Sequence, residues 1–105
     1  MAQVVYSERA FGDFERIFEF LAEEDPPIAA LAVTTIQEAV SILERHPLIG
    51  RPVESELREL VISRGKTGYL ALYSYLEAED VVLVLAATAV LEQSRDVALA
   101  DSLRP

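Results

Sequence analysis

The sequence predicts one α+β domain, in which a helical hairpin packs on an antiparallel sheet in the order β-α-α-β-β-β. Two amphipathic segments fill the first half of the chain and meet at Asp25-Pro26-Pro27. Three short apolar runs follow, at residues 57–63, 69–77 and 81–88. Runs of this length, rich in β-branched and aromatic residues and separated by turn-sized connections, are typical of an antiparallel meander.

The first half begins with a short strand at residues 3–6, and Ser7 follows as the expected N-cap of a helix. Asp25 ends that helix, because a proline disfavours the α conformation in the residue before it. Apolar residues at helical spacing predict one buried stripe on each helix. The stripe of the first helix is Ala10, Phe11, Phe14, Ile17, Phe18 and Leu21. That of the second is Ala29, Ala32, Val33, Ile36, Ala39, Val40 and Leu43.

The connector between the helices and the meander is HPLIGRP, residues 46–52. We expect Pro47 and Gly50 to close the second helix, and Pro52 to keep the connector extended. Gly50 is predicted to adopt a backbone conformation that is costly for other residues. The connector is therefore interpreted as architectural.

The last apolar run, Val-Val-Leu-Val-Leu at residues 81–85, is apolar at successive positions. This pattern predicts a central strand that is covered on both faces of the sheet. One cover is the helical hairpin. The other is either a partner protein or the C-terminal segment from Val90 to Leu103, for which we predict a short helix.

Length and composition limit the classes of function. A chain of 105 residues, with 51% apolar and 26% charged residues, is long enough for one domain, residues 1–105. The absence of cysteine excludes disulfides and thiolate metal sites, and one histidine excludes a site that needs two imidazoles. We expect no cofactor, no signal peptide, no membrane span and a location in the reducing cytoplasm.

The net charge of −9 disfavours nucleic acid as a direct partner, because such binding depends on lysine and arginine neutralising phosphates. Five of the nine basic residues fall between positions 45 and 66. The negative charge is concentrated in the first helix, which we interpret as a solvated face. We therefore expect no direct nucleic-acid binding.

Few side chains are candidates for chemistry. His46 precedes a proline at a helix end, where an imidazole more often caps carbonyl groups than catalyses. Tyr69, Tyr73 and Tyr75 point to one face of a strand by its period of two. That face can either stack on nucleic-acid bases or pack against the helices, and the sequence favours packing because no cations lie nearby.

Several of these pieces, in this order and spacing, resemble the ParE/RelE toxin superfamily of bacterial toxin–antitoxin systems. They are Val5-Tyr6-Ser7 before an amphipathic helix, HPLIGRP, Leu57-Arg58-Glu59-Leu60, Gly68-Tyr69 with Tyr73, and the run 81–85. The resemblance implies the β-α-α-β-β-β fold. It also implies a cognate antitoxin, of ribbon-helix-helix type, whose C-terminal segment wraps over the toxin.

The resemblance is closer to the ParE branch, whose better-known members bind and inhibit DNA gyrase. Ribosome-dependent ribonucleases of the RelE branch place an arginine where this chain has Leu70, a basic cluster around residues 90–93, and a tyrosine near Val97. None of these positions is basic or a tyrosine here. The resemblance therefore implies a protein-binding toxin without catalytic residues. Two alternatives stay open: an mRNA interferase that uses Arg58, Arg64, Lys66 and Tyr69, and a degenerate relative that is no longer toxic.

Three apolar residues lie off the buried helical stripes, Phe20 on the first helix and Leu31 and Ile42 on the second. They predict a groove for an amphipathic segment of the antitoxin, unless the C-terminal segment from Val90 covers them. Arg58 and Tyr69 complete the predicted partner-binding residues.

Overall fold

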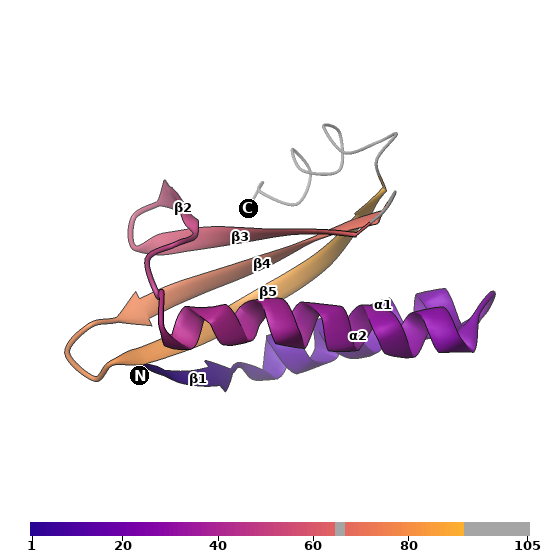
Figure 1. Cartoon of the computed structure of the whole chain (residues 1–105), viewed down its shortest axis with the longest axis horizontal. Helices are drawn as coiled ribbons and strands as arrows, with labels where there is room; N and C mark the ends of the chain where they lie inside the picture. Colours follow the sequence, from indigo (N-terminus) through magenta and orange to yellow (C-terminus); the bar gives the residue numbers. More distant parts are fainter. Residues whose placement is uncertain (65–66, 92–105) are drawn as a thin grey trace.

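The computed structural model describes residues 1–64 and 67–91 and forms two layers, with both helices on one face of a five-stranded sheet (Figure 1). The predicted α+β fold is confirmed. The elements are β1 (Gln3–Tyr6), α1 (Glu8–Ala22), α2 (Pro26–Ser41), the 3-10 turn η1 (Ile42–Glu44), β2 (Arg51–Glu54), β3 (Leu57–Arg64), β4 (Thr67–Leu76) and β5 (Val81–Leu91).

The sheet is mixed, with strand order β1-β5-β4-β3-β2. Strands β2 to β5 are antiparallel, as predicted, but β1 pairs in parallel with β5. The prediction of a wholly antiparallel sheet was wrong in this respect. The first strand adds to the edge of the meander formed by the last strand, β5, and the two strands run in the same direction. The connector also contributes an edge strand, β2, so that the sheet has one strand more than predicted.

The helices begin where the sequence places them. Ser7 caps α1 by accepting a hydrogen bond from the Ala10 amide at 3.1 Å, and Asp25 caps α2 through the Ile28 amide at 3.2 Å. Two members of the predicted stripe differ: Phe11 and Phe18 are 55% and 41% exposed. The buried stripe of α1 is narrower than predicted, because only the side that carries Ala10, Phe14 and Ile17 packs into the core.

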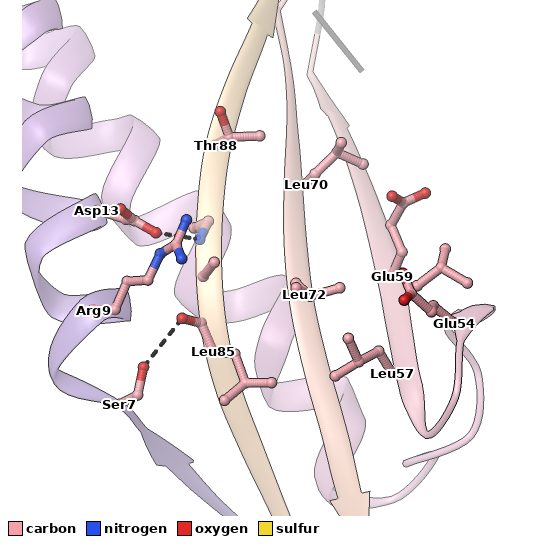
Figure 2. A pocket seen from close by; sticks show the side chains of 13 residues that line it. Ser7, Arg9, Asp13, Glu54, Leu57, Glu59, Leu70, Leu72, Leu85 and Thr88 are labelled. Atoms are coloured by element: carbon pink, nitrogen blue, oxygen red, sulfur yellow. Dashed lines mark hydrogen bonds between the residues drawn. The ribbon is translucent and has the colours of Figure 1, made fainter. Parts of the chain in front are cut away.

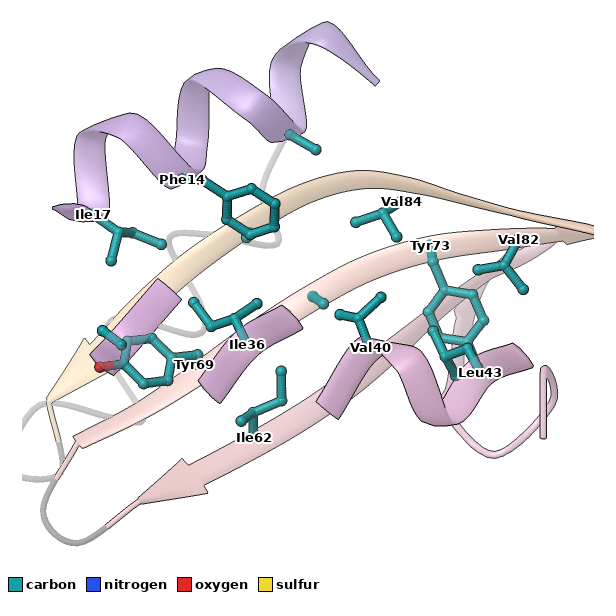
Figure 3. Packing of buried hydrophobic residues seen from close by; sticks show 14 of the residues in the cluster. Phe14, Ile17, Ile36, Val40, Leu43, Ile62, Tyr69, Tyr73, Val82 and Val84 are labelled. Carbon is teal, nitrogen blue, oxygen red and sulfur yellow. The ribbon is translucent and has the colours of Figure 1, made fainter. Parts of the chain in front are cut away.

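The core lies between the helices and the sheet (Figure 3). Tyr69 and Tyr73 of β4 are 4% and 0% exposed, and the partly buried Tyr75 packs against the same cluster. The three tyrosines share the helix-facing side, as the period of two predicts. They pack against apolar residues and offer no open stacking surface. Their main partners are Phe14, Ile17, Ile36, Val40, Leu43, Ile62, Val82 and Val84.

Strand β5 contains a bulge, because Tyr73 pairs with Val84 and Leu72 with Ala86, which leaves Leu85 as an extra residue. Strand β1 pairs with β5 only as far as Val84, so the next part of that edge has no neighbouring strand. The start of α1 takes its place. The amide of Ser7 donates to the Val84 carbonyl at 3.0 Å, and its hydroxyl donates to the Leu85 carbonyl at 3.2 Å.

Asp13 of α1 binds the next part of the β5 edge, where a neighbouring strand would otherwise pair. Its Oδ2 accepts a hydrogen bond from the Ala87 amide at 2.9 Å, and its Oδ1 pairs with Arg16. The residue is only 7% exposed. The expectation that Asp13 belongs to a solvated acidic face was therefore wrong, because a buried amide needs an acceptor and this carboxylate supplies it.

We predict that Asp13→Ala lowers the free energy of unfolding by about 1–3 kcal/mol, because it leaves the buried Ala87 amide without an acceptor. Chemical denaturation measures the change. Glu15→Ala is the matched control: it removes an exposed carboxylate from the same helix and is expected to change stability by less than about 0.5 kcal/mol. Equal stability of the two variants would contradict a role for Asp13 in closing the β5 edge.

Candidate functional site

The sheet face opposite the helices carries a pocket of about 780 Å³ (Figure 2). Four leucines from the three central strands line it: Leu57 of β3, Leu70 and Leu72 of β4, and Leu85 of β5. Residues of the first part of α1 with its N-cap, of β2, and of the same β3 and β5 strands complete the lining: Ser7, Arg9, Asp13, Val53, Glu54, Glu59, Ala86, Ala87 and Thr88. Within residues 1–64 and 67–91, no helix lies over this face. Of the run 81–85, which predicted a second apolar face, only Leu85 lines the pocket.

Half of the six polar residues in the described part of the lining are carboxylates, Asp13, Glu54 and Glu59; the others are Ser7, Arg9 and Thr88. Glu59 is 2% exposed and pairs with Arg51, while Glu54 is exposed on β2. Asp13 also lines the pocket, and Arg9 extends from α1 beside it (Figure 2). Arg9 is the one basic residue among the described residues of the lining. A leucine floor with several carboxylates does not favour an RNA phosphate backbone.

The connector lies on the helix side and is held by Tyr73. The Tyr73 hydroxyl donates to the Pro47 carbonyl at 2.8 Å and accepts from the Gly50 amide at 2.9 Å. Burial raises the pKa of the Tyr73 phenol, although the Gly50 amide and the Arg58 charge lower it. The hydroxyl therefore keeps its proton at neutral pH and can donate to Pro47.

Arg58 holds the same connector from β3. Its Nη1 donates to the Leu48 carbonyl at 3.0 Å and to the Gly50 carbonyl at 2.8 Å. By the alternation of β3, Arg58 shares the helix-facing side with Leu60 and Ile62. Its guanidinium is engaged with backbone carbonyls on the face opposite the pocket.

Gly50 is required for a different reason from the predicted one. Its φ angle lies outside the left-handed region, so its backbone conformation is open to other residues. A Cβ atom at this position would lie 2.5 Å from the Tyr73 hydroxyl oxygen. The expectation about its backbone conformation was therefore wrong. Glycine is needed at this position because the buried Tyr73 ring leaves no room for a side chain. Helix α2 also ends earlier than predicted, at Ser41, and η1 follows.

The predicted partner-binding residues do not form one cluster. Phe20, Leu31 and Ile42 are exposed, at 65%, 38% and 48%, on the helical layer. Arg58 serves the connector. Tyr69 lies in the core with 4% exposure, so its side chain is not available to a partner, because the strand's alternation turns it toward the helices.

Helix α2 and η1 together, Pro26–Glu44, form a 19-residue segment that is long and apolar enough to span a membrane by length and composition. From the sequence we expected no membrane span. In the fold, its inner residues are buried in the core: Ala29, Ala32, Ile36, Val40 and Leu43. A core helix of a globular domain has the same composition, and here the extra hydrophobicity comes from the exposed apolar residues on its outer side.

Comparison with known proteins identifies the family. Residues 4–97 match the model of the ParE toxin of the type II toxin–antitoxin system parDE. The chain belongs to the ParE toxin family. It is 36% identical over 73 residues to Toxin RelE1 of Caulobacter vibrioides. These 73 residues are 70% of this chain and 78% of the relative.

Solved structures share the ParE/RelE fold. The chromosomal ParDE system of P. aeruginosa has a TM-score of 0.73 and 23% identity, over 86% of this chain and 97% of that one. The E. coli RelBE complex has a TM-score of 0.57 and 13% identity, over 83% and 94%. The chain is therefore a type II toxin of the ParE/RelE superfamily, as the resemblance implied.

The positions that distinguish the two branches can now be placed. Leu70, where the resemblance puts the ribonuclease arginine, is 7% exposed and lines the sheet pocket. Strand β5 extends to Leu91, beyond the predicted end at 88, so Val90 and Leu91 are strand residues. The C-terminal segment, for which a short helix was predicted, therefore begins with two strand residues. The rest of that segment, which includes position 97, lies outside the described residues.

Sequence reasoning did not single out Arg9 or Asp13 as residues of the pocket. Both lie on a helix whose charge suggested a solvated face. The signal that could have found Asp13 is its place within the buried stripe, one residue before Phe14 and three after Ala10. A charged residue at such a position normally has a buried partner.

We predict that Gly50→Ala lowers the free energy of unfolding by about 1–3 kcal/mol, because the new methyl group overlaps the buried Tyr73 ring. Thermal or chemical unfolding measures the loss. Gly12→Ala is the control, since a Cβ at Gly12 meets only the Arg16 side chain, at 3.4 Å. In a helix that change should stabilise by about 0.5–1 kcal/mol. A Gly50→Ala protein as stable as wild type would show that the connector can move away from Tyr73.

Proposed function

We propose that this toxin acts in the cytoplasm by binding a protein target, such as DNA gyrase, and that a cognate antitoxin of ribbon-helix-helix type neutralises it. The main support is the leucine floor of the sheet pocket. Cleavage of a phosphodiester needs cations that stabilise the developing charge and a group that transfers protons. Leu57, Leu70, Leu72 and Leu85 supply neither.

The charge distribution supports the same proposal. Arg58 is bound to the connector carbonyls, and Tyr69 is buried among core residues, so two candidates for a ribonuclease site are used elsewhere. The net charge of −9 opposes approach to RNA. A protein partner is better matched to a surface that is apolar in places and acidic in others.

The second candidate function is a ribosome-dependent mRNA interferase of the RelE type. It is favoured by the 36% identity to Toxin RelE1 and by the presence of Arg9 at the pocket. In that case Arg9 would be the cation nearest to a bound phosphate. A degenerate relative that binds its antitoxin but is not toxic is the third.

The outer side of the helical layer is the proposed antitoxin surface. Leu31 and Ile42 are eleven residues apart, which corresponds to about 16 Å along a helix axis. Phe20, at 65% exposure, lies in the last two turns of α1, beside the first half of the antiparallel α2. An amphipathic helix can place apolar residues three and four apart against such a surface.

We predict that Leu31→Ser with Ile42→Ser weakens antitoxin binding by roughly 10- to 100-fold, because both side chains are exposed apolar anchors on α2 and η1. Calorimetric titration with the antitoxin encoded beside the toxin gene measures the affinity. The control is Val61→Ser, which removes an apolar side chain of 54% exposure from β3. Unchanged affinity in the double variant would place the antitoxin elsewhere on the toxin.

We also predict that the purified toxin leaves mRNA intact with or without ribosomes, because Arg9 is a single cation among carboxylates at the pocket and does not form the cluster of cations that would stabilise the charge developing in cleavage. Primer extension on a translated message tests this, with an active RelE-type ribonuclease as positive control. Gyrase supercoiling is assayed in parallel and is expected to be inhibited. Ribosome-dependent cuts that disappear in Arg9→Ala or Arg58→Ala would overturn the proposal and assign the chain to the interferases.

A further inference from the structure

The connector presents two large aliphatic side chains to solvent. Leu48 and Ile49, which we call the connector tip, are each 58% exposed. Both precede Gly50, whose position the Tyr73 ring fixes. Neither side chain belongs to the core cluster of the described residues, so burial in that core does not explain them.

The backbone of the tip is nevertheless firmly held. Tyr73 binds Pro47 and Gly50, and Arg58 binds the carbonyls of Leu48 and Gly50. The Ile49 amide also donates to the His46 carbonyl at 3.1 Å. Five hydrogen bonds therefore order a segment of four residues, and two of them come from a tyrosine with 0% exposure. Ordering of this kind before binding lowers the entropy that association would otherwise cost.

An arginine lies on each side of the tip in the sequence, Arg45 before it and Arg51 after it, although the protein as a whole is acidic. Arg45 and His46 precede it and are exposed, and the side chain of Arg51, which follows it, is 63% exposed. Exposed aliphatic residues flanked by cations complement a surface that combines an apolar pocket with carboxylates.

We propose that the connector tip is the contact through which this toxin binds its cellular target, and that the target presents an apolar pocket bordered by acidic residues. This inference rests on the proposed function, a toxin that acts by binding a protein. It assigns target binding to Leu48 and Ile49, at the end of α2 opposite Leu31. Ile42 of the antitoxin surface lies at the same end as the tip, but antitoxin and target are assigned different side chains as anchors.

Nucleic acid is the less suitable occupant of this surface. A phosphate backbone would be bound by the basic side chains, whereas the aliphatic pair would gain nothing from it. Arg51 is also shared with the buried Glu59, which reduces the charge it offers. The aliphatic pair is therefore assigned the main role, and the cations orient the acidic partner.

The test expresses the toxin without its antitoxin in an inducible bacterial host and measures the inducer dose that arrests growth. Leu48→Ser with Ile49→Ser is expected to raise that dose by roughly 10-fold or more. Ile49→Glu is the second variant and should have at least the same effect, because its carboxylate meets an acidic partner. Ile28→Ser, which alters an apolar residue of 47% exposure in the first turn of α2, is the matched control and should stay toxic.

Two further measurements make the result specific. The tip variants must have the same melting temperature as the wild-type toxin. They must also bind the cognate antitoxin with unchanged affinity in calorimetric titration. Arg45→Ser and His46→Ser, made together, are expected to weaken toxicity less than the tip variants. Loss of toxicity in the basic variant alone would indicate an anionic nucleic acid and overturn the proposal.

The remaining outcomes separate this inference from the proposed function. A wild-type toxin that arrests growth, with tip variants that arrest it equally, overturns the inference alone. Tip variants that lose antitoxin binding but stay toxic overturn it too, because the tip would then belong to the antitoxin surface. A wild-type chain that never arrests growth refutes the proposed function, and the inference fails with it.

Discussion

The hydroxyl group of Tyr73 is the interaction on which the arrangement of this domain most depends. The ring is wholly buried among residues from both layers, and its oxygen bridges the Pro47 carbonyl and the Gly50 amide. Through these two bonds the centre of the sheet fixes the connector, and the connector fixes the start of the edge strand β2. Arg58 adds the outer support. The helical hairpin and the meander are thereby joined into one body.

The sheet has two apolar faces but only one covered by described helices. Alternation along β4 sends Tyr69 and Tyr73 to the helices and Leu70 and Leu72 to the pocket. The bulge at Leu85 changes the alternation of β5 midway. The edge of β5 beyond Val84, where β1 ends, is open and is closed by Ser7 and Asp13. The Asp13 carboxylate accepts a hydrogen bond from the Ala87 amide at this edge, which explains why one acidic residue of α1 is buried.

Membership of the ParE family and the chemistry of the pocket answer different questions. The family establishes a toxin of a type II system with this fold. Relatives from both branches match the chain, so the family alone does not choose between a protein target and ribosome-bound RNA. The choice depends on particular side chains, and aliphatic residues with carboxylates at the pocket favour a protein target.

The sequence by itself determined the class of fold, the two helices with their N-caps, the meander and the family, because these follow from local periodicity, capping residues and motif order. It also indicated that the sheet is apolar on both faces. The parallel pairing of β1 and β5, the burial of Asp13 and the reason for Gly50 were decided only by the tertiary structure. Each depends on a contact between distant segments: Tyr6 with Val84, Asp13 with Ala87, and Gly50 with Tyr73. Local spacing carries no information about which distant backbone group a side chain will meet.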